Sequence, residues 1–309
     1  MKRRKPFPLK WIPVILVALL ALEFALRLFF GFGRLPLYYT STVYEYALCP
    51  DQDLTRFGKQ FSTNEVGMRS APLGTGESRV LKFGDSVLNG GVRITQDSLS
   101  STRLERMLRK VLPDARVLNV SAGSWGVDNA FSWMREHGDF GAEVLVLVFS
   151  SHDWTDTMTF REVVNRVPYY PGTSPRTAIG DALEWVYSRY LQKVDWESLP
   201  KIKNAPPPTK SDHSTGWENF VRYAEERNLP LIVYHHTTQK ELKRGAWSPE
   251  GSALEEFLKN SPATVVSGFD AGYDDSDYLD DIHLSTSGQR KLARLLYPPT
   301  KTALTNRDA

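Results

Sequence analysis

Hydrophobic and polar residues alternate along most of the chain in short segments whose periods are typical of strands and helices. Short runs rich in apolar residues predict five strands, at 80–83, 117–120, 144–149, 231–235 and 263–267. Apolar residues at helical spacing predict helices at 99–111, 128–136, 178–191, 217–227 and 285–297. The run VLVLVF at 144–149 is apolar throughout, as expected of a central strand buried on both faces. Strands that alternate with helices predict a parallel sheet with helices on both sides.

The N-terminal pattern is different, because Trp11–Phe32 is apolar over 22 residues, close to the roughly 20 that cross a bilayer as a helix. Glu23 and Arg27 interrupt it, but they stand four apart, so they share a helix face and can pair. We interpret 11–33 as a transmembrane signal anchor. Five basic residues within 1–10 predict a cytoplasmic tail and an extracytoplasmic body, periplasmic or extracellular.

Two alternatives for this segment stay open. A cleaved signal peptide would have a shorter apolar region and end in small residues, and Gly31-Phe32-Gly33-Arg34 makes a poor cleavage site. An amphipathic or core helix of a soluble protein is the other alternative. Cys49 does not suggest a lipoprotein, because the bulky Leu48 precedes it and it lies far beyond the apolar run.

The remaining chain divides into a few regions. Turn-forming residues at 34–78 predict a juxtamembrane segment with a short hairpin around Phe57–Arg69. Residues 79–298 carry the alternating strands and helices of one α/β domain, and a tail follows at 299–309. The stretch 154–216 interrupts the alternation with one helix and a proline-rich loop at 204–210. It is an insertion that forms either a lid over a site or a plain surface excursion.

Composition and charge narrow the classes of protein. A single cysteine excludes intramolecular disulfides and multi-cysteine metal sites. The net charge is +2, and because the first ten residues contribute +5, the remainder carries −3. A mildly acidic body does not suit nucleic-acid binding, and nothing in the sequence identifies a protein partner.

Candidate chemistry follows the predicted strands, at the sheet edge where ligands bind in open α/β folds. Ser86 comes directly after the first strand, Gly123 after the second and His152 after the third. Far downstream, Asp280 stands three residues before His283. A carboxylate at that spacing can turn back to accept the imidazole Nδ1–H, which leaves Nε2 free as a base.

Taken in order, the blocks Gly84-Asp85-Ser86, Gly123 and Asp280-x-x-His283 resemble those of SGNH/GDSL-type hydrolases, a family of serine esterases and acyltransferases. The resemblance covers about residues 79–298 and implies a flavodoxin-like three-layer α/β/α sandwich with a parallel sheet, here preceded by one transmembrane helix. It further implies Ser86 as nucleophile, His283 as general base and Asp280 as the orienting acid. The N–H groups of Ser86 and Gly123 would form an oxyanion hole, and no cofactor or metal is expected.

Two departures from the family pattern concern the site. Val87 replaces the usual leucine after the serine, a mild change in the core. The third block, normally Gly-x-Asn-Asp, reads Ser150-Ser151-His152-Asp153, which puts His152 where the family has an asparagine donor. An imidazole N–H can also donate, so His152 is a candidate third member of the oxyanion hole. The alternative is that His152 merely packs and leaves two donors.

Other features of the sequence are weaker candidates for a functional site. His235-His236 ends a predicted strand and would be a metal pair only with a third ligand, which the sequence does not offer at suitable spacing. The acidic run at 274–281 lacks the regular spacing of a calcium loop. Four tryptophans suit either a sugar-binding groove or the core: Trp125, Trp133, Trp154 and Trp247.

These observations predict a membrane-anchored, extracytoplasmic serine esterase or O-acyltransferase. Its expected substrate is an acyl ester, in the first place an acetyl ester, of an envelope carbohydrate. Two alternatives remain: a non-catalytic carbohydrate-binding or polysaccharide-assembly protein that kept the fold, and a lipid esterase that works at the bilayer surface.

Overall fold

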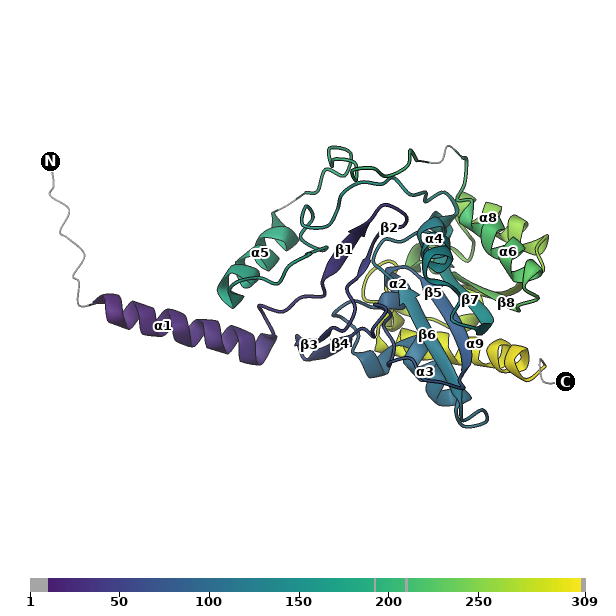
Figure 1. Ribbon diagram of the computed structural model, residues 1–309, viewed down its shortest axis with the longest axis horizontal. Helices are drawn as coiled ribbons and strands as arrows, with labels where there is room; N and C mark the ends of the chain where they lie inside the picture. The colour runs from purple at the N-terminus through teal and green to yellow at the C-terminus, as the bar shows by residue number, and fades with distance from the viewer. Residues whose placement is uncertain (1–10, 192, 209–210, 307–309) are drawn as a thin grey trace.

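A five-stranded parallel sheet forms the centre of the computed structural model, which describes residues 11–191, 193–208 and 211–306 (Figure 1). The strands are β5 (Ser78–Gly84), β6 (Ala115–Ser121), β7 (Ala142–Ser150), β8 (Leu231–His236) and β9 (Thr264–Ser267). Their spatial order is β6-β5-β7-β8-β9, and every neighbouring pair is parallel. This is a doubly wound order whose direction reverses at β5, so the carboxyl ends of β5 and β7 flank the crevice where such folds bind ligands.

Helices cover both faces of the sheet, as the strand–helix alternation predicted. One face packs on α2 (Ser86–Asn89), α3 (Ser100–Leu108) and α9 (Thr286–Thr305), and the other on α4 (Val127–His137), α6 (Gly216–Glu226) and α8 (Pro249–Lys259). Side chains of β7 alternate between the two cores: Val144, Val146 and Val148 face α3 and α9, while Leu145, Leu147 and Phe149 face α4 and α6. The three-layer α/β/α prediction is confirmed.

The end predicted for the last helix was wrong, and two helices were missed. Helix α9 does not end at 297 but continues through Pro298 and Pro299 to Thr305, so most of the expected tail is helical. The Thr300 hydroxyl donates back to the carbonyl of Leu296 at 2.7 Å, and Leu304 is buried, so side-chain packing outweighs the proline interruption. Two helices after β8, α7 (Gln239–Arg244) and α8, were not predicted.

The segment before the sheet forms two antiparallel hairpins rather than one. They pair β1 (Tyr38–Ser41) with β2 (Glu45–Leu48), and β3 (Asp53–Arg56) with β4 (Lys59–Ser62). The predicted hairpin therefore exists, but its bounds of 57–69 were wrong. Phe57 and Gly58 both have positive φ, at 51° and 69°, and they form its two-residue turn rather than the start of a strand.

The apolar N-terminal segment is helical, with α1 (Ile12–Ala25) continuing into a π-helical turn, η2 (Leu26–Phe30). The helix Ile12–Phe30 has a mean hydropathy of 2.3 and none of it is buried, so by length and composition it is able to cross a membrane. It projects away from the sheet (Figure 1). Glu23 and Arg27 form the predicted ion pair, at 2.7 Å. The predicted basic tail at 1–10 lies outside the described residues.

Candidate active site

Ser86 lies at the carboxyl edge of the sheet because β5 ends in a tight turn. Position 84 has no room for a side chain, because a Cβ atom there would lie 2.7 Å from the carbonyl oxygen of Val148. Glycine avoids this clash. Asp85 is the N-cap of the short helix α2, and its carboxylate accepts the backbone N–H of Val87 at 2.8 Å. The half-buried Ser86 is therefore the first helical residue after the strand.

The structure brings Ser86, His283 and Asp280 together in one hydrogen-bonded chain. The Oγ of Ser86 lies 2.9 Å from Nε2 of His283, and Nδ1 of His283 lies 2.8 Å from Oδ1 of Asp280. The same Asp280 oxygen also accepts the backbone N–H of His283 at 2.9 Å, which fixes the turn between the two residues. With Nδ1–H donating to the carboxylate, Nε2 is available to accept the serine proton.

Arg93 joins this chain, although nothing in the sequence pointed to it. Its Nη1 donates to Oδ2 of Asp280 at 2.7 Å, across 187 residues of sequence. Burial opposes ionisation of Asp280, but hydrogen bonds from Arg93 and His283 hold the pKa of this carboxyl well below its usual range. Burial and the positive charge of Arg93 also lower the pKa of His283, against the opposing effect of Asp280. The imidazole is therefore neutral, as a general base must be.

Gly123 lies in the loop after β6, and two tyrosines from other segments hydrogen-bond to its carbonyl group. Its carbonyl accepts hydrogen bonds from the hydroxyls of Tyr46, at 2.7 Å, and Tyr170, at 3.2 Å. Tyr46 belongs to the β1–β2 hairpin and Tyr170 to the insertion, so two segments outside the sheet hold the Gly123–Ser124 peptide, which directly follows the Gly123 N–H. Neither tyrosine was singled out in the sequence.

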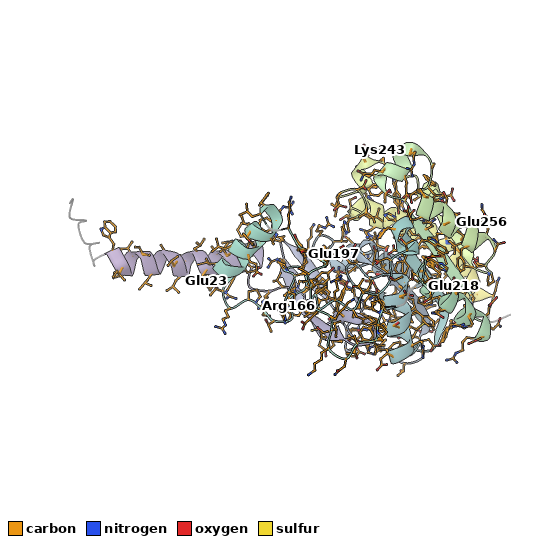
Figure 2. The ribbon with its side chains drawn as sticks, turned by 90° about the horizontal axis from the view of Figure 1, so that it is seen from above. Glu23, Arg166, Glu197, Glu218, Lys243 and Glu256 are labelled. Atoms are coloured by element: carbon orange, nitrogen blue, oxygen red, sulfur yellow. The ribbon has the colours of Figure 1, made fainter. Side chains whose placement is uncertain are left out.

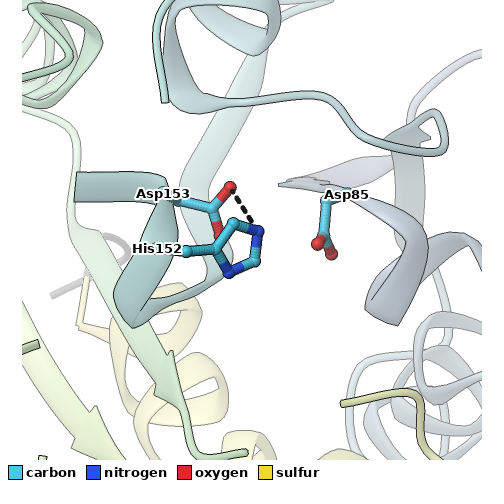
Figure 3. A group of neighbouring side chains, drawn as sticks. All are labelled: Asp85, His152 and Asp153. Atoms are coloured by element: carbon cyan, nitrogen blue, oxygen red, sulfur yellow. Dashed lines mark ion pairs between the residues drawn. The ribbon is translucent and has the colours of Figure 1, made fainter. Parts of the chain in front are cut away.

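His152 follows β7 in a short 3₁₀ helix, η4 (Ser151–Trp154), and its side chain is 55% exposed. Its Nε2 lies 3.6 Å from Oδ1 of Asp153, beyond hydrogen-bond distance (Figure 3). The ring therefore lies at the surface rather than in the core. Its role as an oxyanion donor stays a prediction.

Two buried carboxyl groups lie beside His152, and their closeness was not foreseen. Ligand atoms of Asp85, His152 and Asp153 all lie within 4.8 Å of one another (Figure 3). One oxygen of each carboxyl accepts a backbone N–H, and Oδ1 of Asp153 has no hydrogen-bond partner among the described residues. Burial raises the pKa of Asp85 to about 7 and that of Asp153 well above its usual range. This pair therefore keeps a proton near neutral pH unless a cation replaces it.

The two adjacent histidines of β8 serve separate contacts rather than one metal. Their side chains point to opposite faces of the strand. His235 stacks on Trp247 and lies 3.0 Å from Ser151 Oγ, whereas Nε2 of His236 donates to the carbonyl of Ile282 at 2.8 Å. Burial lowers the pKa of His236 to about 4, so this ring is neutral and braces the turn that carries His283.

Gln289 of α9 makes a second set of supporting hydrogen bonds near the site, which the sequence did not reveal. Its Nε2 donates to the carbonyl of Val87 at 2.7 Å, and its Oε1 accepts the N–H of Ser100 at 2.9 Å. The side chain is fully buried. It therefore ties the helix that follows His283 to the helix that carries Ser86.

The tryptophans and the acidic run, the remaining candidates from the sequence, take part in packing and ion pairs. Trp125 and Trp133 are buried, and Trp154 and Trp247 stack on His213 and His235. None of the four is fully exposed, and the partly buried Trp154 lines a surface cavity together with Val221 and Phe257. In the acidic run, Asp277 is buried and accepts the Lys291 ammonium at 2.6 Å.

No family model and no curated protein matches the chain. Among solved structures, an esterase active on acetylated mannans (CEX) is 13% identical with a TM-score of 0.43, over 74% of this chain and 50% of that one. The chain thus spans about half the length of that two-domain esterase. A lipase/acylhydrolase from Enterococcus faecalis is 13% identical with a TM-score of 0.45, over 73% and 96% of the two chains. A family 3 carbohydrate esterase from Clostridium thermocellum is 16% identical with a TM-score of 0.39, over 75% and 100%.

Proposed function

We propose that this chain is a serine esterase or O-acyltransferase. The observation that carries the proposal is the Asp280–His283–Ser86 hydrogen-bonded chain at the carboxyl edge of the sheet. Ser, His and Asp in this mutual geometry perform acyl transfer on unrelated folds, which is why the arrangement weighs more than overall similarity.

The geometry suits a two-step reaction. His283 Nε2 takes the proton of Ser86 as Oγ attacks the acyl carbonyl, and Asp280 stabilises the resulting imidazolium. The negative oxygen of the tetrahedral intermediate would accept hydrogen bonds from the N–H groups of Ser86 and Gly123 and from the ring of His152. Collapse of the intermediate releases the alcohol, which receives the proton from His283. Water or a sugar hydroxyl then attacks the acyl-serine by the reverse sequence.

For the substrate we propose an acyl ester, in the first place an acetyl ester, of an envelope carbohydrate. The side chain of Asp280 is 43% exposed and that of His283 27% exposed, so the reacting groups lie close to the surface. A shallow site suits a short acyl group on a bulky polymer. A lipid ester is the second candidate, favoured by the apolar N-terminal helix.

We further propose that Trp11–Phe32 anchors the protein in a membrane with the body outside the cytoplasm. The unburied apolar helix and the basic residues before it support this orientation. Alkaline phosphatase fused after residue 309 should be active and β-galactosidase at the same place inactive. The full chain should also resist extraction by carbonate; release as a shortened soluble protein would instead indicate a cleaved signal peptide.

The activity test uses the full chain in detergent with p-nitrophenyl acetate and a fluorophosphonate probe. The wild-type chain should hydrolyse the ester and form a covalent adduct, and Ser86→Ala should do neither. Ser252→Ala, an exposed serine on α8, is the matched control and should behave as wild type. An undiminished rate in Ser86→Ala would end the serine-esterase proposal. A wild-type chain that neither hydrolyses the ester nor forms the adduct would favour the carbohydrate-binding alternative.

A further inference from the structure

Helix α5 (Ala178–Tyr190), inside the 154–216 insertion, carries an apolar stripe that faces outward. Leu183, Val186, Tyr187 and Tyr190 follow the i, i+3, i+4, i+7 spacing of one helix face. Their exposed fractions are 67%, 46%, 53% and 69%, and Leu191 directly after the helix is 72% exposed. In a soluble protein such a stripe normally faces the core. The apolar face of α5 points outward instead.

The opposite face of α5 is firmly held, so the outward direction of the stripe is fixed. Asp181 is buried and forms a bidentate ion pair with Arg56, at 2.6 and 3.0 Å, while it also accepts the N–H of Gly33 at 2.6 Å. Trp185 packs edge-on against Phe32, with ring centroids 6.2 Å apart. The helix is thereby attached to Phe32, the last residue of the proposed anchor, and to Gly33 directly after it.

The beginning of α5 contacts the anchor helix itself. Glu23 accepts the backbone N–H groups of Ala178 and Ile179, at 2.8 and 2.9 Å, and Arg27 donates to the carbonyl of Arg176 at 3.2 Å. Figure 1 shows α5 near the end of α1 that leads into the body, and Figure 2 labels Glu23 where the two helices meet. The two charges that interrupt the apolar run therefore bind α5 as well as each other.

The depth of this contact follows from helix geometry. Glu23 lies seven residues before Phe30, the last residue of the helical segment. At 1.5 Å per residue that places it about 10 Å inside the outer end of the apolar helix. If the helix spans a bilayer, the start of α5 lies at the level of the outer leaflet.

We propose that α5 is an interfacial helix whose apolar stripe inserts into the outer leaflet beside the anchor. The inference rests on the anchoring part of the proposed function, and its partner is a lipid bilayer. Tyr187 and Tyr190 are the residue type enriched at membrane–water boundaries, and Arg189 and Lys193 provide cations for lipid phosphates nearby. This part of the insertion is then a membrane contact rather than a lid over Ser86.

The test places an environment-sensitive NBD fluorophore on single cysteines of the full chain in a Cys49→Ser background. Leu183→Cys and Tyr187→Cys probe the stripe, and Glu256→Cys on α8 is the control, since Figure 2 shows this residue far from α1. The labelled proteins are reconstituted into vesicles of phosphatidylcholine and phosphatidylglycerol. The substituted side chains are exposed, so the packed face of α5 stays intact.

We expect blue-shifted emission at both stripe positions, and loss of most of it when spin-labelled lipid is added, with neither change at the control. Stripe probes that stay as water-exposed as the control, on protein that floats with the vesicles, would overturn the interfacial helix alone. Protein that does not float with the vesicles would overturn the anchor together with it. Esterase activity is independent of both results.

Discussion

Replacement of His152 by alanine separates catalytic from structural roles for the residue that departs from the family pattern. The side chain is 55% exposed and Oδ1 of the neighbouring Asp153 is 3.6 Å from its ring, beyond hydrogen-bond distance, so its removal breaks no buried hydrogen bond. The free energy of unfolding should therefore change by no more than about 0.5 kcal/mol. For 309 residues the unfolding entropy is about 0.65 kcal/mol/K, so Tm should move by about 1 °C or less.

The effect on catalysis should be much larger. Loss of one oxyanion-hole donor costs about 10²–10³-fold in kcat, or about 2.7–4 kcal/mol. Because the ring is half exposed, water reaches the same position and replaces part of the interaction. We therefore expect a loss near the lower end, about 10²-fold, with KM nearly unchanged since the donor acts mainly in the transition state.

The assay compares kcat, KM and Tm for wild type, His152→Ala and His152→Asn with p-nitrophenyl acetate, after subtraction of the Ser86→Ala rate. The asparagine variant restores an N–H donor and should recover much of the rate if its shorter side chain reaches the oxyanion. A folded His152→Ala enzyme with normal kcat would refute the donor role. A change confined to KM would instead place His152 against the substrate.

Three further predictions concern the residues around the site and the anchor. Arg93→Gln removes a cation that disfavours the imidazolium, so the pKa of His283 should rise and the acid limb of kcat/KM should move to higher pH; an unchanged profile would contradict this coupling. Asp280→Asn should lower kcat less than His283→Ala does, and equal losses would mean that the carboxylate does more than orient the ring. Arg56→Met leaves Asp181 buried without its partner and should cost about 3–5 kcal/mol, or about 5–8 °C in Tm by circular dichroism. Replacing Asp181 by leucine in the same chain should restore most of that loss, and no recovery would show that the damage is not due to the orphaned charge.

The sheet and the grouping of Ser86, His283 and Asp280 were predictable because their signals are local. A buried parallel strand appears as a continuous apolar run, and 144–149 lies within the observed central strand. Asp280 and His283 are three residues apart, so their contact needs only one turn of chain. The position of Ser86 followed from the end of one strand.

The supporting contacts were not predictable, because each joins residues far apart whose individual character is ordinary. Arg93 and Asp280 are separated by 187 residues, and Gln289 and Val87 by 202. Arginine and glutamine are common surface residues, and no sequence periodicity distinguishes one that belongs to a site.

The missed helix boundary has a different cause. Prolines at 298 and 299 are a strong stop signal, and only the burial of Leu304 in the folded protein overrides it.

The 197 residues between Ser86 and His283 have a consequence for how the protein is made. Synthesis proceeds from the N-terminus at about 5–20 residues per second, so Ser86 leaves the ribosome about 10–40 s before His283. During that interval all five strands of the sheet, up to β9, become available to pair, but the Ser86 hydroxyl lacks its imidazole partner. The buried Gln289 joins the two parts only when the helix that follows His283 docks. If Ser86 is the nucleophile and Trp11–Phe32 the anchor, as proposed, the Ser86 hydroxyl has no base while the anchor inserts, and its activation begins only after His283 and the helix that carries Gln289 have been made.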